Sequence, residues 1–203
     1  MAFFYRVLQN VFEEAFASRL LDYAIANEQR FQPSEVGSGD AGTVDRATRI
    51  SAVLRNLGPL KADIRERLST RASFFVSELG LSSFDVARIE VEMAAHNDGA
   101  FFGRHIDTIV DDQHELRMMS AVYYFHRQPR RYSGGALRLH ALGRKAGEPD
   151  FQDVAPDHNS LVIFPSWVPH EVQPIVCPSR DFADSRFAIN AWFLRKPAIA
   201  PSR

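Results

Sequence analysis

Two patterns of hydrophobic and polar residues divide the chain. In the first third, apolar residues such as Phe12, Phe16 and Leu20 return at helical spacing with charged residues between them. A second helix is predicted over about 59–78, where the apolar residues fall on one stripe and a proline suits the first turn. The segment 32–45, rich in glycine and small polar residues, is predicted to be a loop that could cover a binding site.

From residue 84 onward the pattern becomes that of β-strands. Residues 87–93 alternate apolar and charged side chains, as a half-buried antiparallel strand does. Further strands are predicted at 119–125, 136–140, 160–164 and 186–194. Helices followed by many short strands predict a mainly β fold with N-terminal helices (α+β), in which a β-sandwich or jelly roll is supported by helices. We therefore divide a single domain into a helical support region (1–83), a β core (84–196) and a short tail (197–203).

Composition narrows the range of functions. The chain has 203 residues, 45% hydrophobic and 24% charged, as in an ordinary globular protein with one core. Its net charge of -1, without a long basic run, argues against nucleic acid as a partner. No uninterrupted apolar stretch predicts a signal peptide or a membrane span. The single cysteine, Cys177, excludes an intramolecular disulfide and fits a reducing cytoplasm.

Three residues form a candidate metal site. His105 and Asp107 lie two positions apart, and on a strand such positions point to the same face. His170, shortly after the apolar run 161–164, offers a third ligand. Two histidines and one carboxylate leave about three positions of an octahedral ion open, as in non-haem iron(II) oxygenases. The pair alone is weak support, because a surface ion pair has the same spacing.

An arginine strengthens this interpretation. Arg186 opens the alternating strand that follows the distal histidine. A guanidinium can hold a carboxylate through two parallel hydrogen bonds, which suits the far end of a dicarboxylic acid. The alternative is an ordinary charge at a strand end. Arg180 competes for the role, but it lies in a polar turn, so we prefer Arg186.

Several motifs occur in the order shown by one enzyme family. The segment 96–107 is similar to that family's aromatic-x-x-Gly-x-x-aromatic-x-x-His-x-Asp, and 123–125 to its tyrosine-bearing strand. Residues 133–139 are similar to Ser-Gly-Gly-x-Leu-x-[Ile/Leu], and 186–192 to Arg-[Phe/Tyr]-Ala-[Ile/Val]-x-x-Trp. Over residues 86–194 the chain resembles the 2-oxoglutarate/Fe(II) dioxygenases, nearest to their prolyl-4-hydroxylase-like branch.

The resemblance implies a double-stranded β-helix, a jelly-roll barrel with the iron inside its mouth. By position, His105, Asp107 and His170 would bind Fe(II). Arg186 would bind the C5 carboxylate of 2-oxoglutarate, with Tyr124 assisting. The implied cofactors are Fe(II), 2-oxoglutarate and O2, with ascorbate as a reductant.

The other pocket positions include two departures from the family pattern. Val172 and Trp192 match positions that line the pocket. His96 stands where the branch usually has tyrosine, so it is either a contact of the cosubstrate or substrate or a packing substitute. Phe102 stands where tyrosine is common, which removes a hydroxyl from the pocket.

The resemblance implies oxidative decarboxylation of 2-oxoglutarate to succinate and CO2, coupled to hydroxylation of a C–H group. Asp107 favours hydroxylation over halogenation, since halogenases of this superfamily carry a small residue there. The expected substrate is a prolyl or other residue of a protein or peptide, and the alternative is a free amino acid or small metabolite. A catalytically silent metal-binding interaction module is the alternative from another class. Nothing in the chain predicts an oligomeric state.

Overall fold

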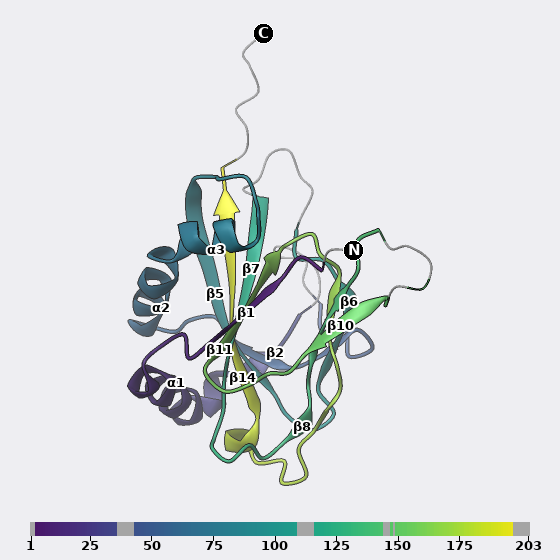
Figure 1. Cartoon of the computed structure of the whole chain (residues 1–203). Helices are drawn as coiled ribbons and strands as arrows, with labels where there is room; N and C mark the ends of the chain where they lie inside the picture. Colours follow the sequence, from purple (N-terminus) through teal and green to yellow (C-terminus); the bar gives the residue numbers. More distant parts are fainter. Residues whose placement is uncertain (1–2, 36–42, 109–115, 144–146, 148, 197–203) are drawn as a thin grey trace.

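Two antiparallel sheets face each other in the computed structural model, which describes residues 3–35, 43–108, 116–143, 147 and 149–196 (Figure 1). In this part of the chain the larger sheet has seven strands in the order β1-β11-β7-β14-β5-β4-β2. These strands are β1 (Arg6–Gln9), β2 (Gln32–Pro33), β4 (Ala52–Leu54), β5 (Val86–His96), β7 (Leu116–Phe125), β11 (Ser160–Pro165) and β14 (Arg186–Arg195). The mainly β architecture predicted from the sequence is confirmed.

The smaller sheet has five strands among the described residues, in the order β10-β9-β12-β6-β3. These strands are β3 (Arg49–Ile50), β6 (Phe101–His105), β9 (Leu137–His140), β10 (Phe151–Val154) and β12 (His170–Val172). A two-stranded pair, β8 (Ser133–Gly134) with β13 (Ile175–Val176), closes one end. The structure therefore places β13 inside the long segment between His170 and Arg186.

Helices cover the outer face of the larger sheet (Figure 1). They are α1 (Glu14–Ala26), α2 (Leu60–Ser69) and α3 (Ala72–Glu78). The single helix predicted over 59–78 is thus wrong in one respect, because it is interrupted at Thr70. The Thr70 hydroxyl donates to the carbonyl of Arg67 at 3.1 Å, a local bond of the kind that competes with helical pairing. The break lets both Ile64 and Phe75 reach the core.

Alternation along β14 separates two cores. Its odd-numbered residues, Phe187 to Phe193, pack against the helices in the larger hydrophobic cluster. Its even-numbered residues face the smaller sheet, where Ala188 packs with Tyr124, Leu137 and Leu139. The polar even positions of β14 therefore lie between the two sheets, and a site can form there.

The first 83 residues supply strands as well as helices. Strand β1 pairs with β11, with Arg6 opposite Ile163, and β2 to β4 extend the two sheets. These strands of two to four residues are too short to show a clear alternation in the sequence. Of the predicted loop 32–45, residues 36–42 lie outside the described residues, as does the predicted tail 197–203. No helix among the described residues is long and apolar enough to cross a membrane.

Asn159 ties the N-terminal segment to the barrel, and its loss is predicted to destabilise the fold. Its buried side chain accepts from the Phe12 N–H (3.1 Å) and the Tyr123 hydroxyl (2.9 Å), and donates to the Phe12 carbonyl (2.8 Å). Its φ of 56° lies in the left-handed region, which alanine tolerates less well than asparagine does. We expect Asn159→Ala to lower the free energy of unfolding by about 2–4 kcal/mol in urea denaturation.

Asn159→Gly is the matched control. Glycine removes the same hydrogen bonds but tolerates the left-handed backbone. The free energy of unfolding of Asn159→Gly should therefore be about 1 kcal/mol higher than that of Asn159→Ala. A loss below about 0.5 kcal/mol for Asn159→Ala would show that these bonds do not hold the N-terminal segment.

Candidate active site

Two histidines from neighbouring strands present the same ring nitrogen to one point. His105 ends β6 and His170 begins β12, and the two residues pair in register. Each Nδ1 donates to a backbone carbonyl, at 2.8 Å to Gly103 and 2.9 Å to Val168. The Nε2 lone pairs are therefore free, and they lie 3.7 Å and 3.5 Å from the Asp107 carboxylate oxygens.

Asp107 lies beyond the end of β6, so the expectation that it shares a strand with His105 is corrected. Its N–H donates to the carbonyl of Ser166 at 2.9 Å, which turns the chain out of the sheet. The Ser120 hydroxyl donates to Asp107 Oδ2 at 2.6 Å and lies 2.9 Å from the Ser166 hydroxyl. Ser120 on β7 thus orients the carboxylate, and Ser166, just after β11, holds the backbone of Asp107.

The three side chains can hold a metal ion. Their ligand atoms lie within 4.8 Å of one another. Burial and the neighbouring His170 lower the pKa of His105 to about 4, so its ring is neutral, as a ligand must be. Burial opposes ionisation of Asp107, but both histidines and hydrogen bonds from Ser120 and Trp192 outweigh it and lower its pKa. The site thus has a neutral His105 imidazole and an ionised Asp107 carboxylate.

Arg186 is a buried cation at the other end of the same pocket. It is 1% exposed, and no carboxylate among the described residues pairs with it. Its Nε has no hydrogen-bond partner in that part of the chain, and its Nη1 contacts His96 Nδ1 at 3.3 Å. Gly135 makes room for it, since a β-carbon there would lie 2.8 Å from the Arg186 Cδ. A buried guanidinium without an anion is costly, so this end of the pocket fits a carboxylate ligand.

Two more buried polar atoms lie beside Arg186 without a hydrogen-bond partner among the described residues: the Tyr124 hydroxyl and His96 Nε2. The guanidinium lies over the Tyr124 ring, 4.6 Å from its centroid. Burial raises the pKa of Tyr124, so the hydroxyl keeps its proton. Burial and the charges of Arg186 and Arg49 hold the pKa of His96 well below its usual range, so its ring is neutral. Both groups can donate a hydrogen bond to a carboxylate.

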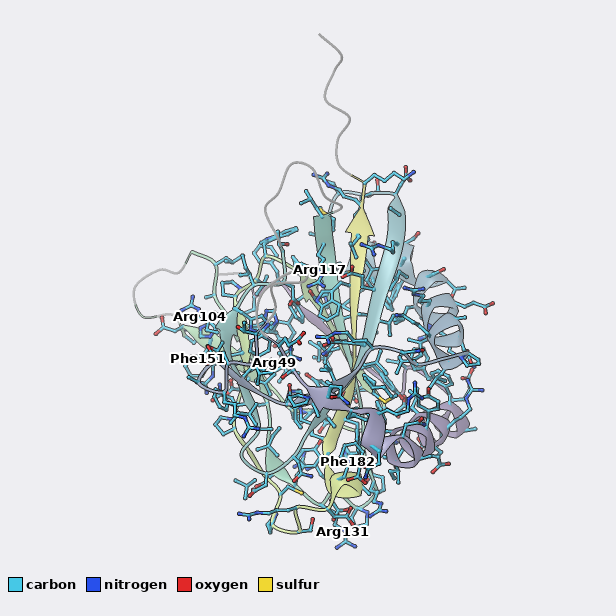
Figure 2. The ribbon with its side chains drawn as sticks, turned by 180° about the vertical axis from the view of Figure 1, so that it is seen from behind. Arg49, Arg104, Arg117, Arg131, Phe151 and Phe182 are labelled. Atoms are coloured by element: carbon cyan, nitrogen blue, oxygen red, sulfur yellow. The ribbon has the colours of Figure 1, made fainter. Side chains whose placement is uncertain are left out.

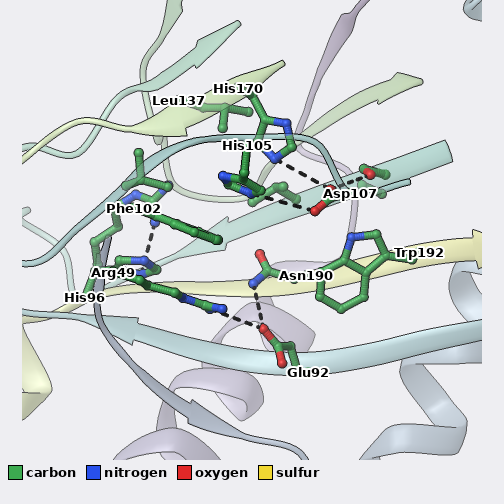
Figure 3. A pocket seen from close by; sticks show the side chains of 15 residues that line it. Arg49, Glu92, His96, Phe102, His105, Asp107, Leu137, His170, Asn190 and Trp192 are labelled. Carbon is green, nitrogen blue, oxygen red and sulfur yellow. Dashed lines mark hydrogen bonds and ion pairs between the residues drawn. The ribbon is translucent and has the colours of Figure 1, made fainter. Parts of the chain in front are cut away.

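One pocket joins the two ends (Figure 3). Of the residues predicted from the sequence, its lining includes His96, His105, Asp107, His170, Val172, Arg186 and Trp192. Tyr124 is not in that lining, and its ring lies against the Arg186 guanidinium. Arg180 lies elsewhere, with a side chain that is 79% exposed and 3.1 Å from Asp98.

Sequence reasoning missed a polar group on the pocket wall, formed by Arg49, Glu92 and Asn190. Asn190 could have been found, because it has the same parity as Arg186 on an alternating strand. Glu92 shares the parity of His96 on β5 in the same way. Arg49 has no comparable signal, since it comes from a two-residue strand of the opposite sheet.

Comparison with known proteins identifies the class. The family described as the 2OG-Fe(II) oxygenase superfamily matches residues 91–194. A protein described as an uncharacterized PKHD-type hydroxylase, from Synechocystis sp., is 40% identical over 141 residues, which cover 68% of this chain and 46% of that protein. The chain therefore spans about half the length of this relative.

Solved structures share the fold. A prolyl-4-hydroxylase of Pseudomonas putida has a TM-score of 0.69 at 22% identity, over 95% of this chain and 93% of that one. A prolyl hydroxylase of Trichoplax adhaerens, in complex with a peptide fragment of the hypoxia inducible factor oxygen degradation domain, has a TM-score of 0.69 at 18% identity, over 94% and 83%.

The chain belongs to the 2OG-Fe(II) oxygenase superfamily, whose members use Fe(II), 2-oxoglutarate and O2. The predicted jelly-roll fold, a barrel of two facing sheets, is confirmed.

Removing the hydroxyl that orients Asp107 is predicted to weaken metal binding. Ser120→Ala leaves Asp107 Oδ2 without its 2.6 Å hydrogen bond. We expect the affinity for Mn(II), a redox-stable probe, to fall by about 10-fold or more in a calorimetric titration. Ser133→Ala, at an exposed position of β8, is the control and should not change it. Equal affinities for all three proteins would contradict a metal-orienting role for Ser120.

Proposed function

We propose that this chain is an Fe(II)- and 2-oxoglutarate-dependent hydroxylase. The observation that supports this proposal is a single pocket with three convergent metal ligands at one end. At its other end lies a buried arginine that no carboxylate of the described residues pairs with. A ligand that both chelates a metal and carries a distal carboxylate fits both ends. A catalytically silent module would have no use for the second end.

In this proposal His105, His170 and Asp107 hold Fe(II). Bound iron would supply the activation of O2 and the oxidative decarboxylation of 2-oxoglutarate that this superfamily performs. The chain's own contribution is geometric: two carbonyls fix the tautomers of the histidines, and Ser120 fixes the carboxylate. The open side of the triad remains free for exogenous ligands.

Arg186 binds the distal carboxylate of 2-oxoglutarate in the proposed complex. His96 accepts from Arg186 through Nδ1, which leaves the proton on Nε2 as a second donor to the same anion. The Tyr124 hydroxyl is the third donor. Val172 and Trp192 line the walls and exclude water from the bound cosubstrate.

The proposed substrate is a prolyl or other residue of a protein or peptide. Large apolar side chains that are exposed occur on segments that supply the site: Ile50 (38%), Ile106 (47%) and Trp167 (38%). Ile106 lies between two metal ligands, and Ile50 follows Arg49. Exposed apolar residues around a site favour a macromolecular partner. A free amino acid or small metabolite is the second candidate.

Loss of a metal ligand is predicted to abolish turnover. With Fe(II), ascorbate and 2-oxoglutarate, the wild type should form succinate, and His105→Ala should lower the rate by at least about 100-fold. His158→Ala, which replaces a histidine paired with Glu14 outside the pocket, is the matched control and should retain the rate. Equal succinate formation by wild type and His105→Ala would contradict the proposed function.

The role of Arg186 is tested by truncating the ligand. We expect Arg186→Leu to weaken 2-oxoglutarate binding to the Mn(II)-loaded protein by about 100-fold, because a charge-assisted bidentate contact is lost. Binding of 2-oxobutanoate, which lacks the distal carboxylate, should be unaffected. His96→Phe should show the same selectivity with a smaller loss. If either variant weakened both ligands equally, the distal carboxylate would not lie at Arg186 and His96.

A further inference from the structure

A carboxylate that the proposed iron and cosubstrate roles leave unused lies on the wall of the pocket. Glu92 is 8% exposed, and the β5–β14 register places it directly opposite Asn190. Arg186 and His96 form the pair four residues along the same two strands, and the pair between them is Ala188 with Ala94. Small residues at that middle position leave space over the sheet for the cosubstrate, and Glu92 borders that space.

The contacts of Glu92 are loose. Its Oε1 lies 3.4 Å from Arg49 Nη2 and 3.3 Å from Asn190 Nδ2. Its Oε2 makes no hydrogen bond to any described residue, and the exposed Arg55 lies 3.7 Å away. Two residues earlier on β5, Glu90 receives two hydrogen bonds from Arg117 at 2.9 and 2.7 Å. The same strand thus holds one saturated carboxylate and one with an open acceptor.

The neighbours of Glu92 have further polar contacts of their own, besides those to Glu92. The Arg49 guanidinium lies over the Phe102 ring, 4.6 Å from its centroid, and its Nε donates to the Ser51 hydroxyl at 3.0 Å. Figure 3 shows Asn190 with its nitrogen turned to Glu92 and its oxygen turned toward the metal ligands. The pocket wall therefore has the Asn190 oxygen turned toward the metal ligands, with the charge of Glu92 directly behind that amide.

We propose that Glu92, together with Asn190, binds an ammonium group of the substrate beside the metal site. The inference rests on the proposed function and narrows its substrate to an amine. A buried carboxylate gains most from a charged donor, since charge-assisted hydrogen bonds are about twice as strong as neutral ones. The amine is that of a free amino acid or of a lysyl side chain in a peptide. A prolyl residue within a peptide has no N–H to offer.

Matched pairs of probes distinguish these sources. Free L-proline is compared with N-acetyl-L-proline, and acetyl-Gly-Lys-Gly-amide with the same peptide acetylated on the lysine. Acetyl-Gly-Pro-Gly-amide serves as the neutral prolyl probe. Succinate formation above the substrate-free rate is measured for wild type, Glu92→Gln and the matched control Glu90→Gln. Binding of each probe to the Mn(II)- and 2-oxoglutarate-loaded protein is measured by calorimetry.

We expect at least one amine to bind and to stimulate succinate formation, and its acetylated partner to be at least about tenfold weaker. Glu92→Gln should lower kcat/KM for that amine by at least about tenfold, and Glu90→Gln by less than about twofold. The inference is overturned if no amine binds, if the neutral probes match the amines, or if Glu92→Gln behaves as wild type.

Calorimetry with 2-oxoglutarate separates this test from that of the proposed function. Glu92→Gln should bind Mn(II) and 2-oxoglutarate as the wild type does, because Glu92 contacts none of the triad or Arg186. A wild type that binds neither Mn(II) nor 2-oxoglutarate would refute the proposed function itself. Normal binding of both without any response to amines would refute only the inference.

Discussion

Strand β14 runs antiparallel between β5 and β7, and its register determines which side chains share the pocket. Arg186 lies opposite His96, Ala188 opposite Ala94 and Tyr124, and Asn190 opposite Glu92. A slip by one residue would turn Arg186 into the helical layer and Phe187 into the pocket, with a large loss of buried apolar contact. The hydrophobic layer beneath the helices therefore maintains the geometry of the polar layer above it. Figure 2 shows the molecule from behind, with Arg49 of the pocket wall near the middle and Arg131 at the lower end.

The polar layer is costly for the folded protein on its own. Arg186, Tyr124 and His96 each keep a buried atom without a hydrogen-bond partner among the described residues. Such groups lower stability unless a ligand satisfies them, and natural proteins accept this cost at functional sites. One dianionic cosubstrate would satisfy the three groups together. The same reasoning applies more weakly to Glu92, which has loose partners rather than none.

The sequence predicted what depends on local pattern. The long strands were found because apolar and polar residues alternate along them, and the metal ligands because His105 and Asp107 are close in the chain and His170 follows a clear apolar strand. Contacts between distant segments were not predictable, such as Arg49 reaching Glu92 across 43 positions. The shortest strands and the helix break at Thr70 were missed because they depend on tertiary pairing and on one hydroxyl.

A crystal structure with Mn(II) and 2-oxoglutarate is the most direct test of the central claim that one ligand connects the two ends of the pocket. We expect the ion to be bonded to Nε2 of His105, Nε2 of His170 and the Asp107 carboxylate. We also expect the keto-acid end of 2-oxoglutarate on that ion and the distal carboxylate on Arg186. A 2-oxoglutarate whose distal carboxylate lies away from Arg186, or an ion bound outside the three ligands, would contradict it.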